Sequence, residues 1–594
     1  MELKARKDMG PRFTWDFTAM FASDEAWEAE IAALNTETDG IDRIKGTLGS
    51  SAKALKSGIL AVQAIAERLE RAYIYAMLHK SADGGEPKYQ AMDGKAMNIY
   101  VKFSMACAFI EPEILAIPEE KLNTYMASSD MDVIRFYVSH ICRMRAHTKD
   151  ESTERLLAQM GDLAQTPQDA YEMLTNVDLE LPLIKDEDGK EQRLTQGNFG
   201  VFRESRDRAV REAAFTAMFG SYKKFNNTFA ATYSGSIKQD VFMSRVRGFE
   251  NSRAAALYSH NVPASVYDSL IAAVRENQPA VRDYIELRKK ALGLDKIDMY
   301  DLYTPMVKDV EYPVTFEEAK VLVKEALKPL GEDYQKLLDR AYAEHWMDVY
   351  ENKGKRSGAF SCGVYGVHPY VLLNYTDTLD DAFTMAHELG HAMHSYLSDT
   401  TQEYINHDYA IMAAEVASIT NEMLLLRYLL KTETQKDKRA YILNHFLESV
   451  RTTMVRQTLF AEFEFKAHEL YEKDEPLTAE ALNKLYFELE CAYYDGAEIP
   501  ELMSYEWSYI PHFYTAYYVY QYATGLASAV AISSRIIDEG RVDGYLKFLT
   551  LGGSDYPIDE LKVAGVDLTQ PTAVASAMQR FEETIKELSA LLDN

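Results

Sequence analysis

The chain has 594 residues, of which 47% are hydrophobic and 26% are charged, a composition typical of globular proteins rather than of disordered or fibrous ones. Its length exceeds that of one ordinary domain core, so two or more packed domains are expected. The formal net charge is −28, and a negative field of this kind repels phosphate backbones and anionic lipid surfaces. We therefore expect neither nucleic-acid binding nor membrane binding.

The cysteines and the first residues of the chain indicate the cellular compartment in which the protein is expected. Cys107, Cys142, Cys362 and Cys491 are far apart and form no CxxC or zinc-finger spacing, which predicts reduced thiols in a cytosolic protein. Residues 1–17 lack the apolar core of a signal peptide, and no apolar run reaches the ~18 residues of a membrane-spanning helix. We expect a cytoplasmic protein.

Apolar residues recur at helical spacing along most of the chain. Residues 24–34, 59–78 and 264–293 have them three and four positions apart, which predicts amphipathic helices. Residues 178–199 differ, because two short apolar segments flank Asp188-Gly189 and predict a β-hairpin.

The hairpin separates two helical regions, so a boundary is expected near residue 200. It would divide an N-terminal helical region, 1–200, from a second region, 201–594. Within the second region, residues 353–376 are rich in glycine and then β-prone, which predicts a loop leading into a strand near 369–375. A mostly α fold with a small β element is expected.

Residues 384–397, TMAHELGHAMHSYL, contain three of the 13 histidines of the chain. In a helix, residues four apart lie about 40° from each other around the axis, so His387 and His391 project side by side toward one cation. Glu388 lies next to that cation without having to coordinate it. This H-E-x-x-H spacing provides two zinc ligands and a carboxylate that can handle a water proton. The alternative is that ordinary histidines share this spacing by chance.

The residues around the motif favour a helix packed closely against another segment. Thr378 and Asp381 have the spacing of a capping box. Gly390 costs about 1 kcal/mol relative to alanine inside a helix, and its missing side chain indicates the close approach of another backbone.

A third ligand is expected downstream, within residues 403–427. Glu415 is the best candidate, because it lies in an alanine-rich stretch whose small side chains allow close helix packing. His394 is less suitable, since three ligands from one straight helix give poor tetrahedral geometry. Glu422 lies seven positions after Glu415 and could hydrogen-bond to a ligand, although an ordinary solvated glutamate is an equal alternative.

A His, His, Glu set leaves one zinc position for water, which is typical of catalytic sites. The metal lowers the pKa of that water and polarises a carbonyl, while Glu388 accepts the water proton and passes it to the leaving amine. The sequence therefore predicts peptide-bond hydrolysis with one zinc ion per chain. Cobalt and manganese accept the same ligands, but zinc fits best.

The stretch HELGHAMH, followed at this distance by EVASITNE, resembles the M3 family of zinc metallopeptidases, and most closely its bacterial oligoendopeptidase F branch. Supporting stretches lie at 14–28, 365–395 and 510–525, so the resemblance covers nearly the whole chain. It implies a helical, two-lobed zincin-type fold with a deep channel and zinc on the channel wall. It also implies endopeptidase action on oligopeptides, with His387, His391 and Glu415 as zinc ligands and Glu388 as general base.

Residues 505–522 contain nine aromatic residues, seven of them tyrosine. Core packing explains most of them, but so many phenolic hydroxyls need hydrogen-bond partners, which a channel wall would offer. The resemblance implies that a histidine and tyrosines here hold the substrate and stabilise the oxyanion, each donor contributing about 2.7–4 kcal/mol. The matching residues are His512, Tyr514, Tyr517 and Tyr520, with His512 and Tyr520 the stronger candidates. The histidine lies nearer the tyrosines than in the thimet-like branch, so the motif leaves open which tyrosine acts.

The glycine-rich segment before the motif is a further candidate for substrate binding. A strand edge at 369–375 could pair with an extended peptide, and Gly363 and Gly366 would let backbones approach closely. His368 could contact the substrate, or it could be a solvated loop histidine.

Three functions compete on this basis. The leading hypothesis is a zinc oligoendopeptidase. A helical zinc carboxypeptidase uses the same motif but needs the free C-terminus of its substrate. A peptide-binding scaffold with structural zinc would not need Glu388.

Overall fold

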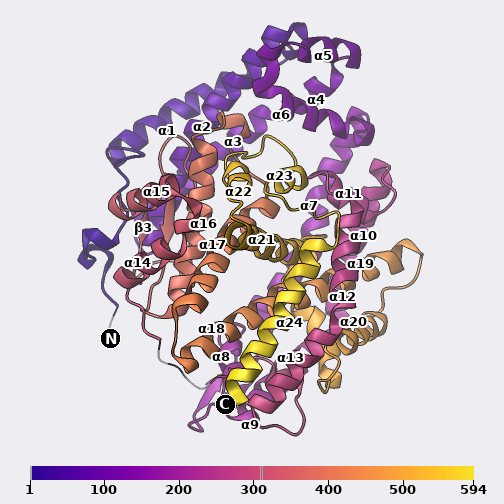
Figure 1. The fold of residues 1–594 in the computed structure, drawn as a ribbon. Helices are drawn as coiled ribbons and strands as arrows, with labels where there is room; N and C mark the ends of the chain where they lie inside the picture. Colours follow the sequence, from indigo (N-terminus) through magenta and orange to yellow (C-terminus); the bar gives the residue numbers. More distant parts are fainter. Residues whose placement is uncertain (1–2, 308–309, 311, 594) are drawn as a thin grey trace. The chain divides into compact units, whose positions relative to one another are not determined.

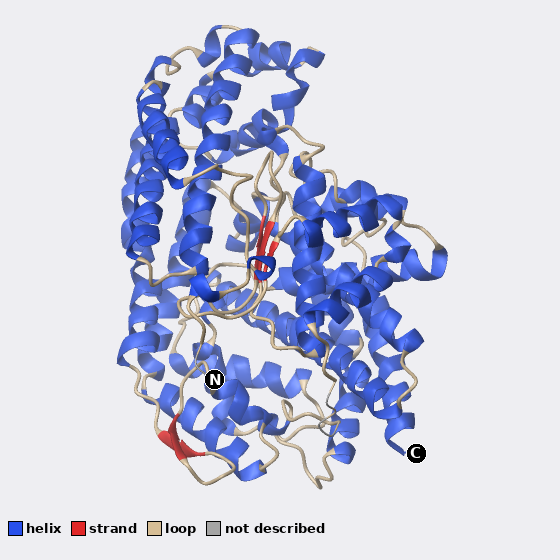
Figure 2. Cartoon of the chain, turned by 90° about the vertical axis from the view of Figure 1, so that its left-hand side faces the viewer, coloured by secondary structure: helices blue, strands red, loops and turns tan. Residues whose placement is uncertain are grey.

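The computed structural model of the chain describes residues 3–307, 310 and 312–593. Helices make up 71% of the chain, and the strands are few and short (Figure 2). The predicted mostly α fold with a small β element is confirmed. Within the described residues, no helix is both long enough and apolar enough to span a bilayer.

The chain forms two compact units, and each unit is assembled from three separate stretches. The first unit comprises Met1–Ala146, Tyr312–Tyr428 and Ile532–Val566. The second unit comprises His147–Glu311, Leu429–Ala531 and Asp567–Asn594. The expected division into regions 1–200 and 201–594 stays a prediction.

The first unit contains the predicted metal-binding segment. Its helices are α1 (Asp24–Asp39), α2 (Ala52–Ala82), α3 (Pro87–Cys107), α4 (Ile110–Ala116), α5 (Glu119–Met126), α6 (Asp132–Arg143), α14 (Phe316–Ala326), α15 (Glu332–Ala343), α16 (Leu379–Asp399), α22 (Asp543–Phe548) and α23 (Pro557–Val563), together with most of α17 (Ile411–Thr432) (Figure 1).

The second unit contains the aromatic segment 505–522. Its helices are α7 (Glu151–Met173), α8 (Phe199–Glu204), α9 (Arg208–Lys224), α10 (Asn226–Arg247), α11 (Ser252–Tyr258), α12 (Ala264–Glu276), α13 (Gln278–Ala291), α18 (Lys436–Ser449), α19 (Arg456–Glu472), α20 (Ala479–Tyr493) and α24 (Thr572–Asp593), and α21 (Tyr520–Glu539) starts in it.

The predicted helices form, and local signals explain where they begin and end. At the start of α1, the Ser23 hydroxyl accepts a hydrogen bond from the Ala26 amide at 3.3 Å, as a capping serine does. The predicted segment 264–293 forms two helices, α12 and α13, rather than one. Pro279 lies in the first turn of α13, where its missing N–H is tolerated, whereas within one continuous helix it would break the hydrogen-bond ladder.

The predicted hairpin is present in the second unit. β1 (Leu183–Lys185) pairs antiparallel with β2 (Glu191–Arg193), with Ile184 opposite Gln192. Gly189 has a φ of 75°, a left-handed conformation that glycine adopts without strain. The Asp188-Gly189 pair therefore forms the turn that the sequence indicates.

The second small sheet lies in the first unit and corrects one expectation. β5 (Tyr370–Leu372) forms within the predicted range, but it is the central strand, parallel to β3 (Met347–Asp348) and antiparallel to β4 (Phe360–Cys362). The three residues of β5 are buried. The expected free edge at 369–375 is therefore wrong, because both sides of this strand are already paired.

The N-terminal segment helps to fix this sheet. The Trp15 indole N–H lies 3.1 Å from the Trp346 carbonyl and 3.0 Å from the Val371 carbonyl. Trp15 and Tyr370 also belong to one hydrophobic core that includes Trp27 of α1 and Tyr75 of α2. The sheet is thus tied to the N-terminal helices of the first unit.

Candidate metal centre

The helix that carries the H-E-x-x-H motif begins at the predicted capping box. The Thr378 hydroxyl accepts from the Asp381 amide at 3.1 Å, and the Asp381 carboxylate accepts from the Thr378 amide at 3.0 Å. Two of the backbone donors at the start of α16 are thereby satisfied. This fixes the position of the first turn, two turns before His387.

α16 and α17 approach closely at Gly390. A Cβ atom built on Gly390 would lie 2.5 Å from the Ser418 Cα and 2.7 Å from the Ala417 carbonyl oxygen, both in α17 (Figure 1). The inferred close approach of another backbone is confirmed. The Asn421 side chain adds a hydrogen bond of 3.1 Å to the Ala386 carbonyl. Asn421, which the sequence analysis did not single out, thus joins the two helices beside the histidines.

The side chains of His387, His391 and Glu415 come together between these helices. One ligand atom from each lies within 4.8 Å of the other two. The two Nε2 atoms are 3.2 Å apart, and His387 Nε2 lies 3.7 Å from Glu415 Oε2. These three residues are half-buried.

Glu422 contacts the other nitrogen of His387. The distance between His387 Nδ1 and Glu422 Oε1 is 2.5 Å, so the imidazole donates from Nδ1 and directs Nε2 toward His391 and Glu415. Burial opposes protonation of His387, but the hydrogen bond to Glu422 and the nearby carboxylates outweigh it and raise the pKa to about 9. Burial, together with the neighbouring His387, lowers the pKa of His391 to about 3.

Glu388 is buried beside this cluster with only 7% of its surface exposed. Its Oε2 has no hydrogen-bond partner among the described residues. Burial is the main cause that raises the pKa of Glu388 to about 7, and Glu415 and Glu422 add to it, while His387 opposes it. A carboxylate with a pKa near neutrality can both accept and return a proton.

His394, the alternative ligand on α16, is directed elsewhere. It is buried and stacks on the Tyr409 ring, with 3.7 Å between the ring centroids. Burial lowers the pKa of His394 to about 3. The neutral ring therefore packs in the core of the first unit.

The donor set fits a zinc ion. Zinc in proteins is bound by imidazole nitrogen and carboxylate oxygen, and catalytic sites typically use three such ligands. Two imidazoles and one carboxylate converge here, the hydrogen bond to Glu422 orients one imidazole, and the unpartnered Glu388 oxygen lies alongside.

The glycine-rich segment packs against α16. A Cβ atom on Gly363 would lie 2.9 Å from the Ser395 Cβ, so Gly363 allows the chain after β4 to contact the metal-site helix. Gly366 has a φ of 75°. His368 is buried rather than solvated, and its ring lies parallel to Trp346 with centroids 5.2 Å apart. A substrate contact by these three residues stays a prediction.

In the second unit, the tyrosines of the aromatic segment differ in their surroundings. The Tyr514 hydroxyl lies 2.7 Å from the Thr232 hydroxyl. The Tyr517 hydroxyl lies 3.3 Å from the Ser252 hydroxyl, and its ring is buried. Tyr520 is also buried, and its ring lies against the Tyr267 ring of α12, with 5.2 Å between the centroids.

The backbone at Tyr517 is held in an uncommon conformation. Its φ is 55°, a left-handed value that non-glycine residues rarely adopt. The Tyr517 amide donates to Glu464 Oε1 of α19 at 2.6 Å. Glu464 and His468 are buried, and His468 Nε2 lies 3.2 Å from Asp240 Oδ2. No signal within residues 505–522 indicates this support, because α19 lies far from the aromatic segment along the chain.

His512 is exposed and has two aromatic neighbours that the sequence analysis did not single out. His512 Nε2 lies 3.5 Å from the Tyr522 hydroxyl, and the Tyr518 ring lies parallel to the imidazole at 6.2 Å. Partial burial lowers the pKa of His512. Tyr518 lies just before α21 and Tyr522 in its first turn, so no regular helical spacing links them, and only the density of tyrosines in residues 505–522 indicated them.

Comparisons with known proteins agree over the whole chain. The sequence profile of Peptidase family M3 matches residues 201–580, and that of Oligopeptidase F matches residues 113–180. Oligopeptidase PepF of Bacillus subtilis is 43% identical, over 100% of this chain and 89% of that protein. An oligoendopeptidase F homolog of Lactococcus lactis subsp. lactis is 38% identical, over 99% of both chains. The crystal structure of oligoendopeptidase-F from Enterococcus faecium matches with a TM-score of 0.75 and 36% identity, over 96% of this chain and 99% of that one.

Proposed function

Since the chain belongs to peptidase family M3 and is a metalloendopeptidase, we propose that it cleaves internal bonds of short peptides at one zinc ion held by His387, His391 and Glu415. Peptidases of this family depend on zinc in general. The observation that carries the proposal is the convergence of three ligand atoms within 4.8 Å, beside a buried glutamate. The identity of the metal and the role of each residue rest on this convergence.

Each side chain has a distinct task in the proposed reaction. The zinc ion, when bound, polarises the substrate carbonyl and makes the attacking water more acidic. Glu388 accepts the water proton at its unpartnered Oε2 and then delivers it to the leaving amine. Glu422 keeps His387 in the tautomer whose Nε2 is available as a ligand.

We assign His512 and Tyr520 to the substrate side of the reaction. Both are hydrogen-bond donors that can bind the peptide and stabilise the oxyanion that forms at the attacked carbonyl. Tyr520 is the preferred donor because the hydroxyls of Tyr514 and Tyr517 already contact those of Thr232 and Ser252. Substrate binding by Tyr514 and Tyr517 stays a prediction.

Mass spectrometry of the products from a mixed pool of short peptides tests this function. Each peptide is supplied with a free and with an amidated C-terminus, and the reaction is run with and without a chelator. We expect internal cleavage of both forms, loss of cleavage with the chelator, and recovery on addition of zinc. Cleavage restricted to free C-termini would instead indicate a carboxypeptidase. Full activity in enzyme shown by elemental analysis to be free of metal would refute the metal assignment.

A further inference from the structure

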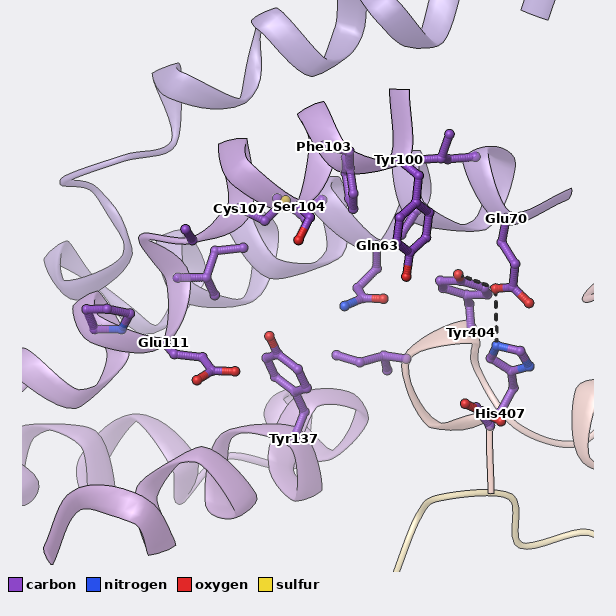
Figure 3. Close-up of a pocket in the computed structure, with 18 residues that line it drawn as sticks. Gln63, Glu70, Tyr100, Phe103, Ser104, Cys107, Glu111, Tyr137, Tyr404 and His407 are labelled. Carbon is purple, nitrogen blue, oxygen red and sulfur yellow. Dashed lines mark hydrogen bonds and ion pairs between the residues drawn. The ribbon is translucent and has the colours of Figure 1, made fainter. Parts of the chain in front are cut away.

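The first unit contains a cavity of about 880 Å³ whose lining includes none of the metal-site residues. Residues of α2, α3, α4 and α6 form its walls, and the loop 404–408 closes one side (Figure 3). That loop joins α16 to α17, the two helices of the metal centre. The volume falls in the range of roughly 300–1,000 Å³ that is typical of small-ligand pockets.

Aromatic side chains line much of this cavity. Tyr100 and Ser104 are four residues apart on α3, as are Phe103 and Cys107, so one face of that helix is directed into the cavity. Tyr137 of α6 faces them (Figure 3). Tyr100 is 50% exposed. Such rings pack against apolar stems and attract cations to their faces.

The charge of the cavity wall is negative. Three carboxylates line it, from Glu70, Glu111 and Asp408, and the lining includes no lysine or arginine. The single histidine, His407, is already paired, because Nδ1 lies 2.8 Å from Asp399 Oδ1 and Nε2 lies 3.7 Å from Glu70 Oε2. These pairs outweigh burial and raise the pKa of His407 to about 9, so its charge is neutralised locally.

The other two carboxylates are not neutralised in this way. The Asp408 carboxylate lies near the charged His407 and accepts a hydrogen bond from the Tyr409 amide. Among the described residues, no lysine or arginine lines the cavity beside Glu111 or Asp408 to pair with their charges. A complementary ligand therefore combines a cation with an apolar stem. Because the enzyme acts on peptides, the basic side chain of a peptide is the cation of this kind that it meets.

We propose that this cavity is a second peptide-binding site, which takes up an arginine or lysine side chain. The aromatic rings of Tyr100, Phe103 and Tyr137 pack on the stem, and the carboxylates of Glu111 and Asp408 attract the charge. The site is independent of the metal centre, so a peptide can be bound here without being cleaved.

Cys107 provides a local probe of occupancy, because it lines the cavity and is half-buried. Its rate of alkylation by iodoacetamide is measured by mass spectrometry in the full-length enzyme, with N-acetyl-arginine amide or its neutral analogue N-acetyl-citrulline amide present. Cys491, which is exposed and belongs to the second unit, is the internal control. We expect the arginine compound to slow alkylation of Cys107 roughly ten-fold at saturation, as a bound ligand that covers the thiol should, and to leave Cys491 unchanged.

Two double variants then test the charges. In Glu111→Gln/Asp408→Asn, the arginine compound should need a roughly ten-fold higher concentration for half-protection, because the attraction of two carboxylates is lost. The matched control, Glu119→Gln/Glu120→Gln, removes the same charge from the exposed start of α5, outside the cavity, and should behave as the wild type. Thermal melting of each variant checks that it is folded.

Three results would overturn the proposal. They are equal protection by the arginine and citrulline compounds, unchanged protection in the folded Glu111→Gln/Asp408→Asn variant, and protection by free spermidine at a lower concentration than by the arginine compound. The last would assign the cavity to polyamines rather than to peptides. None of these measurements requires turnover, so they are independent of the proposed zinc mechanism.

Discussion

The metal-site helices α16 and α17 and the aromatic segment 505–522 position their polar side chains in different ways. In the helices, His387 and His391 share one face because they lie four residues apart, and Gly390 lets α17 bring Glu415 to them. In the aromatic segment, the short 3₁₀ helices Glu501–Tyr509 and Pro511–Tyr514 and the left-handed Tyr517 interrupt any regular period.

The difference has a consequence for neighbouring residues of the same type. Tyr514, Tyr517 and Tyr520 lie three residues apart in sequence, yet the first two direct their hydroxyls to Thr232 and Ser252, whereas the Tyr520 ring packs on Tyr267 of α12. In a regular helix, the spacing of residues therefore determines which side chains lie together. In an irregular segment, the direction of each side chain is determined separately, through contacts with helices that are distant in the chain.

The largest effect on catalytic activity is expected from a substitution of one side chain on α16. Glu388→Gln keeps the size of the side chain and removes the proton acceptor, so kcat should fall by roughly 10²–10⁴-fold. The zinc content should stay at that of the wild type, because Glu388 is not a proposed ligand. Steady-state kinetics combined with elemental analysis measures both quantities. Turnover at the wild-type rate in this variant would show that Glu388 is not the proton acceptor.

In the aromatic segment, a comparable effect is expected from one tyrosine and not from its neighbour. Tyr520→Phe should lower kcat by roughly 10²–10³-fold, the usual effect of losing one donor to an oxyanion. Tyr514→Phe is the matched control, in which the lost contact is that to Thr232, and its effect should be at least ten-fold smaller, as expected for one net hydrogen bond. If Tyr514→Phe lowered kcat more than Tyr520→Phe did, the oxyanion donor would be Tyr514.

The close packing of α16 against α17 can be tested by adding one methyl group. Gly390→Ala places a Cβ 2.5 Å from the Ser418 Cα, so the helices must separate, and the free energy of unfolding should fall by roughly 1–3 kcal/mol. The zinc affinity should fall with it, because Glu415 moves with α17.

The control for this variant is Gly220→Ala, in the interior of α9, where a Cβ would have no neighbour within 4 Å. It should raise the free energy of unfolding by about 0.5–1 kcal/mol, since alanine is favoured over glycine in helices. Denaturant unfolding of both variants provides the comparison. Equal stabilities would mean that the helices are not in contact at Gly390.

The last effect depends on pH and concerns the Glu464 carboxyl group, which accepts the hydrogen bond from the Tyr517 amide. Burial raises the pKa of Glu464 to about 8, while His468 opposes the shift. The folded state therefore keeps a proton that the unfolded chain releases above its ordinary carboxyl pKa, and stability falls as the pH rises from about 5 to 8, by at most about 1.4 kcal/mol per pH unit. The Asp240–His468 pair acts in the same direction, because the pKa of His468 is raised despite its burial.

Glu464→Gln removes this pH dependence while keeping an acceptor for the Tyr517 amide, so its stability curve between pH 5 and 8 should be flatter than that of the wild type. Glu464→Leu also removes the acceptor and should lower stability by roughly 1–3 kcal/mol at every pH. Thermal unfolding across this pH range distinguishes them. Parallel curves for wild type and Glu464→Gln would mean that Glu464 does not titrate in this range.

The parts of the molecule that depend on spacing were predictable from the sequence. The capping box at Thr378, the close approach at Gly390 and the hairpin turn at Gly189 are all present, because each is decided by residues within a few positions of one another. The H-E-x-x-H spacing likewise indicated which histidines would share a face.

The parts that depend on distant pairing were not predictable. β5 was expected as an edge strand, but β3 and β4 enclose it, and no local signal in residues 369–375 reveals its partners. The burial of His368 against Trp346 and the hydrogen bond from the Tyr517 amide to Glu464 were likewise not predictable from nearby residues. In each case the deciding contact comes from another part of the chain.

The discontinuous make-up of the two units also constrains how the enzyme can be synthesised. The first unit ends its first stretch at Ala146 and is completed only by Val566. At about 5–20 residues per second, a ribosome needs roughly 20–80 s to make the intervening chain. During that time α1 to α6 have emerged without their later packing partners, and their apolar faces are available to chaperones or to other nascent chains.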